Sequence, residues 1–304
     1  MVGPGSVGSL LAAKLAQNLG GDEIVLAGRG APSPATEAHL AAAAEQGIEV
    51  SGEESFTARP EVSRGPGGGP ADALLLAVKA DQAAEAARAF SPLLKPATLV
   101  GLLPNGLGLA ADLPPGYPRE RTVRGLVHSG AERIAPGRVR MAGAPALVLA
   151  PAFGGETGAA EALAGILREG GIRAEVRAGG GEEEWRKAAA NLVINPLGAV
   201  LGLRNGELLE VEEARALFET LAGEVQPVAE AEGAALDVLA LAREAARATA
   251  GNRNSMWQDL RAGRKTEVEA LTGRFLALAK KHGLPAPANE MLRLSVKAME
   301  GRKR

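Results

Sequence analysis

Residues 3–8 read Gly3-Pro4-Gly5-Ser6-Val7-Gly8 and lead directly into Ser9–Leu19, a stretch with a helical pattern of apolar residues. This G-x-G-x-x-G spacing is typical of a turn that binds a dinucleotide. The first glycine makes the tight bend, the second lets the backbone approach the pyrophosphate, and the third permits close helix–strand packing. The N-terminus of the following helix then faces the phosphates. The spacing alone is a weak signal, because the chain contains 40 glycines.

The residue that reads the ribose of the cofactor is expected about twenty residues further on, at the end of the next strand. The apolar run Ile24–Ala27 ends there and is followed by Gly28-Arg29, with no Asp or Glu. A carboxylate would bind the 2′-hydroxyl of NADH and repel a 2′-phosphate, whereas a guanidinium attracts it. Arg29 therefore favours NADPH over NADH; the alternative interpretation is an arginine on a solvated surface.

Further continuous apolar runs occupy residues 73–78, 98–103 and 147–149, and residues 173–176 resemble a last strand. Such runs, separated by helical segments, are typical of buried parallel strands joined by crossover helices. We therefore predict an α/β fold with a doubly wound, Rossmann-type parallel sheet in a dinucleotide-binding domain that spans residues 1–178.

The predicted first strand is unusual. Only Met1 and Val2 precede Gly3, whereas strands average about 5–6 residues. Either this strand is very short, or the start of the chain is misassigned or truncated.

The pattern changes after Gly179-Gly180-Gly181, because strand-like runs stop and long amphipathic stretches such as Glu207–Gly233 follow. We predict an all-helical, substrate-binding domain over residues 179–304. Its helix over Thr266–His282 is expected to begin with a capping box at Thr266-Glu267-Val268-Glu269 and to end at Gly283.

The composition excludes several classes of function. Lys and Arg total 34 and Asp and Glu total 36, and this net charge of −2 gives no support for a nucleic-acid or anionic-membrane partner. The chain has no Cys, and its three His are far apart in sequence, so we expect no metal site. The sequence contains no run of about 18 apolar residues, the length that predicts a membrane span. We therefore expect a cytoplasmic protein.

Polar residues follow two of the predicted strands. Lys79 comes after the strand at residues 73–78, and Asn105 comes after the strand at residues 98–103. Ligands of open α/β sheets bind outside the carboxyl ends of the strands, where both side chains would lie. The alternatives are an ordinary turn at Asn105 and a solvated residue at the start of a helix for Lys79.

Lys187, Asn191 and Asn195 recur at intervals of four residues, which places them on one face of a predicted helix. Their neighbours are Ala, Leu, Val and Ile, so this polar stripe lies in a segment that otherwise reads as buried. Buried polar groups need partners, and a ligand rich in oxygen would supply them. The alternative is a lysine that extends to solvent, with the asparagines bonded to another helix.

A second polar cluster, Asn252–Asp259, is followed by Arg264–Glu267. Ser255 and Glu267 are its candidate functional residues. Each has a structural alternative, since Ser255 could cap a helix and Glu267 could interact with a helix dipole.

Together these motifs resemble the ketopantoate reductase (2-dehydropantoate 2-reductase) family over nearly the whole chain. The resemblance rests on the glycine-rich turn, Val78-Lys79, Asn105-Gly106-Leu107-Gly108, Trp185-Arg186-Lys187-x(3)-Asn191-x(3)-Asn195-Pro196-Leu197, Asn205-Gly206-Glu207-Leu208 and Asn254-Ser255-Met256-x-Gln258-Asp259-x(7)-Glu267.

The resemblance implies NADPH-dependent reduction of 2-dehydropantoate to pantoate in pantothenate biosynthesis. It implies that Lys187 donates the proton and that Glu267 belongs to the catalytic set. The substrate would be bound by Asn105, Lys187, Asn191, Asn195, Asn205 and Ser255. The cofactor would be bound by Gly3, Pro4, Gly5, Ser6, Val7, Gly8, Lys79, Asn105, Ala131 and Glu267. Arg29 joins this set because of its position after the strand at residues 24–27. A homodimer is compatible with this reading.

Two alternatives remain open at this point. A related NADPH-dependent reductase could act on another small 2-oxo acid with the same proton donor. The chain could also be a non-catalytic NADPH-binding sensor, although a sensor has no need to retain Lys187 and Glu267.

Overall fold

The computed structural model describes residues 1–30, 32–67 and 69–301. Its contacts divide the chain into two compact units. Unit 1 contains Met1–Pro104 and Gly108–Gly180, and unit 2 contains Asn105–Leu107 together with the chain from Gly181 onward. The placement of Asn105–Leu107 in unit 2 differs from the predicted domain ranges. The Leu107 side chain packs in the core of unit 2, and its carbonyl accepts a hydrogen bond from Arg274.

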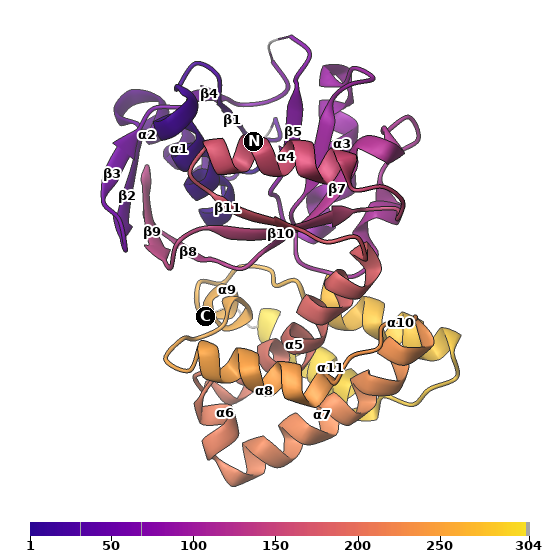
Figure 1. The fold of residues 1–304 in the computed structure, drawn as a ribbon. Coiled ribbons are helices and arrows are strands. Elements are labelled where there is room, and N and C mark those ends of the chain that lie inside the picture. The colour runs from indigo at the N-terminus through magenta and orange to yellow at the C-terminus, as the bar shows by residue number, and fades with distance from the viewer. Residues whose placement is uncertain (31, 68, 302–304) are drawn as a thin grey trace. The chain divides into compact units, whose positions relative to one another are not determined.

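The main sheet of unit 1 confirms the predicted strands (Figure 1). Its strands pair in the order β4 (Glu61–Ser63), β1 (Val25–Ala27), the single residue Val2, β5 (Ala73–Leu76), β6 (Leu99–Leu102), β7 (Thr122–Val127), β10 (Ala146–Pro151) and β11 (Arg173–Val176). All four residues of β6 are buried, as expected for a strand that is covered on both faces.

Val2 takes the place of the predicted first strand. It forms parallel bridges with Ala27 of β1 and Leu76 of β5. Its N–H donates to the Leu75 carbonyl at 2.8 Å, and its own carbonyl accepts from the Ala77 N–H at 2.7 Å. One residue therefore joins both halves of the sheet and places the glycine-rich turn at the carboxyl ends of β1 and β5.

The sheet is parallel from β4 to β7, but β10 runs antiparallel to β7. A parallel partner for β7 would need a crossover connection. Here the chain instead leaves the main sheet through the hairpin of β8 (Gly130–Ala135) and β9 (Arg138–Ala142) and returns in the opposite direction. The prediction of a doubly wound sheet is confirmed, with this one antiparallel pairing as a correction.

The hairpin belongs to a second sheet that the sequence analysis did not predict. Its order is β3 (Phe56–Ala58), β2 (Ile48–Gly52), β9 and β8. Its strands are only half buried, and β9 shows the alternation typical of such strands, because buried Val139 and Met141 alternate with exposed Arg138, Arg140 and Ala142.

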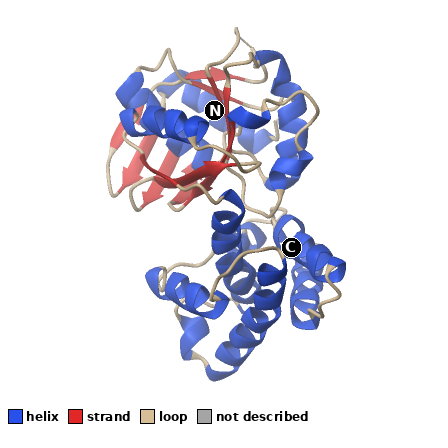
Figure 2. Ribbon diagram, turned by 45° about the vertical axis from the view of Figure 1, so that its right-hand side comes forward, coloured by secondary structure: helices blue, strands red, loops and turns tan. Residues whose placement is uncertain are grey.

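Helices accompany both sheets of unit 1 (Figure 2). They are α1 (Ser6–Leu19), α2 (Pro34–Gln46), α3 (Ala83–Phe90) and α4 (Gly158–Glu169), with short 3₁₀ turns at Ala80–Gln82, Ser91–Leu93, Leu109–Asp112 and Arg119–Arg121. Helix α1 is buried on two sides: Leu10 packs in the core beside the second sheet, and Leu11 packs in the core shared with α4.

Unit 2 is helical throughout its described residues, as predicted. Its helices are α5 (Gly180–Leu201), α6 (Glu207–Glu210), α7 (Glu212–Ala231), α8 (Val238–Ala248), α9 (Ser255–Arg261), the π-helical segment Glu269–Gly273, α10 (Arg274–Lys281) and α11 (Pro287–Glu300). Phe218 and Phe275 are fully buried in its core. Within the described residues, no helix has the length and apolar composition that a membrane span requires.

The predicted helix over Thr266–His282 needs a correction at its start. The Thr266 N–H and hydroxyl donate to Glu300 at 2.7 and 2.6 Å, and Glu269 accepts from Arg293 at 2.8 Å. The capping box does not form, because Glu300 of α11 takes the Thr266 N–H and Arg293 of α11 takes the Glu269 carboxylate that would have paired with it. The Thr266 hydroxyl still accepts from the Val268 N–H at 3.3 Å. The predicted end is confirmed, since Gly283 has a positive φ of 68° after Lys280 and Lys281.

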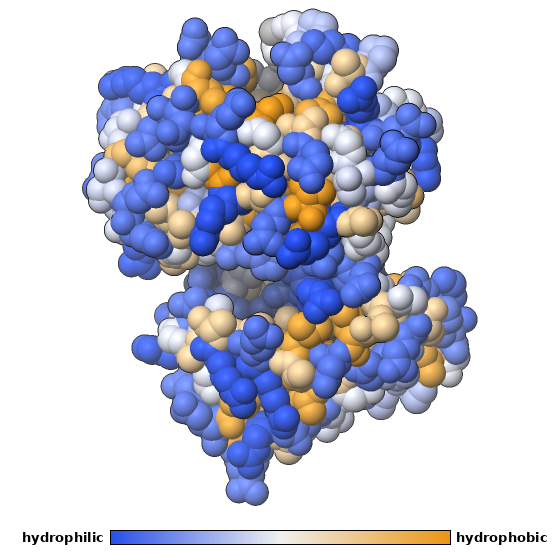
Figure 3. Space-filling view, viewed as in Figure 1, coloured by the Kyte–Doolittle hydropathy of each residue, from blue (hydrophilic) through white to orange (hydrophobic). Residues whose placement is uncertain are grey.

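Hydrophilic residues predominate on the visible face of each unit, and apolar residues lie scattered among them (Figure 3). Such scattered apolar residues are normal for a protein surface.

The imidazole of His39 holds three parts of unit 1 together. His39 of α2 is fully buried; its Nδ1 accepts from the Gly137 N–H at 3.0 Å, and its Nε2 lies 2.8 Å from the Ser9 hydroxyl. Because Nδ1 accepts, the neutral ring carries its proton on Nε2 and donates to Ser9. Burial, together with the nearby charge of Arg133, lowers the pKa of His39 to about 4.

We expect this histidine to make the stability of unit 1 depend on pH. The unfolded chain binds a proton at His39 near pH 6.5, but the folded chain does so only near pH 4. The free energy of unfolding should therefore fall as pH drops from 6.5 towards 4, by about 2 kcal/mol between pH 7 and 5. Urea unfolding of the wild type and of His39→Gln, which cannot titrate, measures this loss. An equal loss of unfolding free energy in both proteins would contradict the role of His39, because the loss would then come from titrating carboxylates, which both proteins share.

Candidate active site

The glycine-rich turn in unit 1 has the shape that its spacing predicts. A Cβ at Gly8 would lie 2.0 Å from the Gly3 carbonyl oxygen, and a Cβ at Gly3, where φ is +107°, would lie 2.8 Å from backbone atoms of Ala77. Nothing lies within 4 Å of the Cβ position at Gly5. The first and third glycines are thus required by close packing, and the second faces the open space that a pyrophosphate needs.

Strand β8 runs beside this turn. The Arg133 N–H donates to the Ser6 hydroxyl at 3.0 Å, and its guanidinium donates to the Pro4 carbonyl at 3.3 Å. The structure therefore brings the strand of Ala131, one of the predicted cofactor contacts, to the glycine-rich turn.

Arg29 and Lys79, two other predicted cofactor contacts, follow the ends of β1 and β5. Both strands pair with Val2, so their carboxyl ends lie at the same edge of the sheet. Lys79 precedes the 3₁₀ turn Ala80–Gln82. Arg29 donates to the Glu85 carboxylate at 2.9 Å.

In unit 2, the predicted polar stripe lies on α5, so Lys187, Asn191 and Asn195 share one face of a continuous helix. Asn195 is buried, at 9% exposure, and the other two are half-buried. The opposite side of the helix supplies Leu192 and Val193 to the core of the unit.

Asn254 connects α5 to α9. Its side-chain oxygen accepts from the Trp257 N–H at 2.9 Å and caps α9, while its amide nitrogen lies 3.4 Å from the Ile194 carbonyl. A Cβ at Gly198 would lie 2.5 Å from this amide nitrogen, so a glycine is needed there. Because Asn254 is the cap, the structural alternative for Ser255 is excluded: Ser255 is the first residue of α9, and its side chain is exposed.

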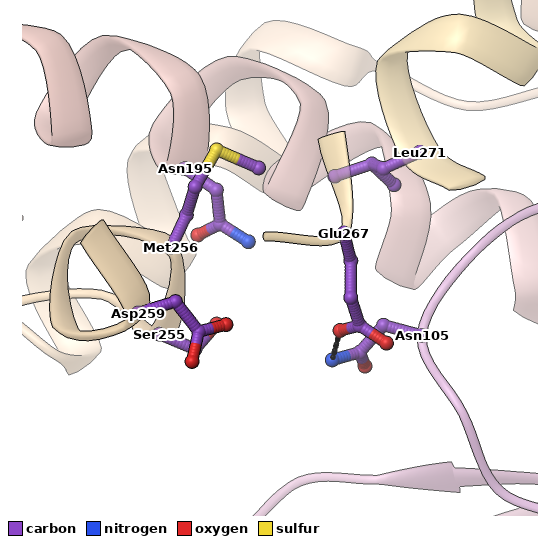
Figure 4. Close-up of a pocket in the computed structure, with 7 residues that line it drawn as sticks. All are labelled: Asn105, Asn195, Ser255, Met256, Asp259, Glu267 and Leu271. Carbon is purple, nitrogen blue, oxygen red and sulfur yellow. Dashed lines mark hydrogen bonds between the residues drawn. The ribbon is translucent and has the colours of Figure 1, made fainter. Parts of the chain in front are cut away.

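A pocket forms where these elements meet the start of the π-helical segment. It is lined by Asn105, Asn195, Ser255, Met256, Asp259, Glu267 and Leu271 (Figure 4). Ser255 and Asp259 project from α9 and face Asn105 and Glu267 across the opening, with the amide of Asn195 between them. Side chains from four separate segments of the sequence therefore meet in one place.

Glu267 is held from two directions. Its carboxylate accepts from the Asn105 amide at 3.2 Å. The preceding residue, Thr266, is fixed by the Glu300 carboxylate, which also accepts from Lys297 at 2.6 Å. Burial raises the pKa of Glu300, but hydrogen bonds from Lys297 and Thr266 outweigh it and lower the pKa below its usual value. Glu300 is therefore ionised at neutral pH and holds the chain just before Glu267.

Not every predicted residue lines the pocket. Lys187 lies two turns and Asn191 one turn before Asn195 along α5, and neither of them lines the pocket. Asn205 is buried, and its amide donates to the Thr249 hydroxyl at 2.8 Å. Among the residues that the structure describes, its side-chain oxygen has no hydrogen-bond partner.

Asp259, which was not among the predicted site residues, also lines the pocket and pairs with Arg264 at 2.9 Å. Helical spacing could have found it, since Asp259 lies four residues after Ser255 and so shares its face of α9. Met256 and Leu271 give the pocket an apolar part, for which the sequence offered no signal.

The pocket combines amide and hydroxyl donors with two carboxylates. The donors suit a small ligand with carboxylate or carbonyl oxygens, and the carboxylates can accept from its hydroxyl groups. Within residues 1–30, 32–67 and 69–301, no group of three or more His, Cys, Asp or Glu side chains could hold a metal ion.

Comparisons with known sequences cover both units. The family described as "Ketopantoate reductase PanE/ApbA" matches residues 1–153, and "Ketopantoate reductase PanE/ApbA C terminal" matches residues 182–300. A 2-dehydropantoate 2-reductase of Halobacterium salinarum is 34% identical over 290 residues, which are 94% of this chain and 93% of that protein. One from Archaeoglobus fulgidus is 29% identical over 300 residues, with 99% and 97% covered.

Solved structures agree with these matches. A PanE/ApbA family ketopantoate reductase from Ralstonia eutropha JMP134 superimposes with a TM-score of 0.86 at 28% identity, covering 99% of this chain and 98% of that one. A D-mandelate dehydrogenase bound to NADH and anilino(oxo)acetate has a TM-score of 0.88 at 26% identity, with the same coverage. The chain belongs to the ketopantoate reductase family.

Proposed function

We propose that the chain catalyses NADPH-dependent reduction of 2-dehydropantoate to pantoate. The observation that carries this proposal is the pocket in unit 2. Asn105, Asn195, Ser255 and Glu267, which were predicted from three separate motifs, line it together. The names of the relatives from Halobacterium salinarum and Archaeoglobus fulgidus support the same substrate.

The glycine-rich turn suits a dinucleotide, because Gly5 leaves open space where the pyrophosphate would approach. We propose that residues 3–8, Arg29, Lys79 and Ala131 hold NADPH, with Asn105 and Glu267 near its reacting end. When bound, the reduced nicotinamide supplies a hydride to a carbonyl carbon.

The remaining chemistry belongs to side chains of this protein. Reduction of the C2 carbonyl leaves negative charge on its oxygen, and a positioned ammonium can stabilise that charge and give it a proton. We assign this role to Lys187. Ser255 would hold the carboxylate of the substrate, and asparagine amides from the set Asn191, Asn195 and Asn205 would hold its hydroxyl group.

A reductase of another small 2-oxo acid is the second candidate. The structural similarity to D-mandelate dehydrogenase favours it, because that enzyme is named for a different 2-hydroxy acid and was solved with NADH. The sensor alternative gains no such support, since the relatives bear the names of reductases.

Replacing Lys187 tests the proposed proton donor. Lys187→Ala should lower kcat by at least about 10²-fold, the lower end for general acid–base catalysis, and should leave NADPH binding unchanged. Because only the ammonium form can donate, the wild-type rate should fall at alkaline pH as Lys187 loses its proton, and the variant should lack this dependence. A small external amine should restore part of the rate.

Arg186→Ala is the matched control, because Arg186 is the neighbouring cation on α5, is exposed and pairs with Glu182. It should keep wild-type kcat. A Lys187→Ala enzyme with near wild-type kcat and an unchanged pH profile would refute the assignment.

Ser255→Ala tests substrate recognition. Loss of one hydrogen bond to a carboxylate should raise KM for 2-dehydropantoate about ten- to hundred-fold, with NADPH affinity and folding unaffected because Asn254 caps α9. Ser295→Ala removes the hydroxyl of a half-buried serine that donates to the Met291 carbonyl within α11, and it should change neither the KM nor the NADPH affinity. An unchanged KM in Ser255→Ala would remove Ser255 from the substrate site.

A further inference from the structure

The guanidinium assigned to the 2′-phosphate of NADPH already has an anionic partner. Arg29 Nη1 donates to Glu85 Oε2 at 2.9 Å, with the arginine side chain 27% exposed and the glutamate 71% exposed. Any phosphate that binds Arg29 must therefore compete with this carboxylate for the same donors.

Glu85 reaches this position from an unusual part of the fold. In dinucleotide-binding domains, the acidic residue that reads the ribose lies at the end of the strand that follows the glycine-rich turn. Here Arg29 occupies that place after β1, and the carboxylate comes from the first turn of α3, after β5. The ends of β1 and β5 both pair with Val2, which is why residues 56 positions apart can meet.

The backbone next to Arg29 contacts a residue that forms another ion pair. The Gly30 N–H donates to the Arg64 carbonyl at 2.7 Å, so the backbones next to Arg29 and at Arg64 are in contact. Arg64 in turn pairs with Glu37 at 2.5 Å. The charges of these two arginines are thus balanced by two glutamates, which leaves Lys79 as the other cation that the proposed function assigns to the cofactor.

We propose that Glu85 sets the choice of cofactor by competing with the 2′-phosphate for Arg29, and that the chain binds NADH as well as NADPH. This inference rests on the proposed function. With NADPH, Arg29 leaves Glu85 and takes the phosphate, against repulsion from the released carboxylate. With NADH, the ion pair stays intact and the Glu85 carboxylate accepts a hydrogen bond from the ribose 2′-hydroxyl.

The exposure of the Arg29–Glu85 ion pair sets the expected size of its effect on the Kd of the cofactor. Exposed ion pairs shift equilibria by about two- to five-fold, and loss of repulsion against a doubly charged phosphate adds to this. Glu85→Gln should therefore lower the Kd for NADPH about two- to ten-fold and leave the Kd for NADH equal or higher. Because Glu85 is exposed, salt should reduce this difference between the two proteins.

The test is titration of the purified full chain with NADPH and with NADH, in which cofactor fluorescence monitors binding. The proteins compared are the wild type, Glu85→Gln and Glu161→Gln. Glu161 is a matched control, since it also lies in the first turn of a helix and pairs with an arginine, Arg168. The ratio of the two Kd values should shift towards NADPH in Glu85→Gln alone. In an Arg29→Ala background, which should itself weaken NADPH, Glu85→Gln should have little further effect.

Three results would overturn the inference: an unchanged ratio in Glu85→Gln, an equal shift in Glu161→Gln, or a full shift that persists without Arg29. A wild-type chain that binds NADPH but not NADH would overturn the claim of dual binding. A wild-type chain that binds neither cofactor would overturn the proposed function itself, and this inference with it.

Discussion

The pocket of unit 2 depends on the side chain of Asn254. One amide caps α9 through the Trp257 N–H and also reaches the Ile194 carbonyl of α5. Gly198 leaves the space that this contact needs. A helix as short as α9 has little stability of its own, so its position depends on such contacts. Ser255 faces the same pocket as Asn195 because Asn254 joins their two helices.

The opposite side of the pocket relies on α11. Glu300 fixes Thr266, and Arg293 takes the Glu269 carboxylate that a capping box would have used. The chain between them presents Glu267 to Asn105 and continues into a π-helical turn, a geometry that is frequent at functional sites. Charged groups outside the pocket thus position the carboxylate inside it.

Features with a local pattern could be predicted from the sequence. Apolar runs predicted β1, β5, β6 and β10 of the main sheet but not β4 or β7, and four-residue spacing placed Lys187 and Asn195 on one helical face. Features that depend on distant partners could not be predicted. The second sheet is half buried, and Glu85 meets Arg29 only through the order of the strands. The capping box is lost because α11 takes the Thr266 N–H and the Glu269 carboxylate. The family resemblance supplied roles for residues such as Asn205, whose side chain the structure places in a bond with Thr249.

If the pocket of unit 2 serves reduction of 2-dehydropantoate, the specificity of the wild type should reflect it. The measurement is kcat/KM, with NADPH and with NADH, for 2-dehydropantoate, pyruvate and 2-oxo-2-phenylacetate, the 2-oxo acid that corresponds to mandelate. We expect 2-dehydropantoate to have the highest kcat/KM with either cofactor. A higher value for one of the other acids would contradict the assigned substrate, and oxidation of neither cofactor with any of the three acids would contradict the proposed reaction.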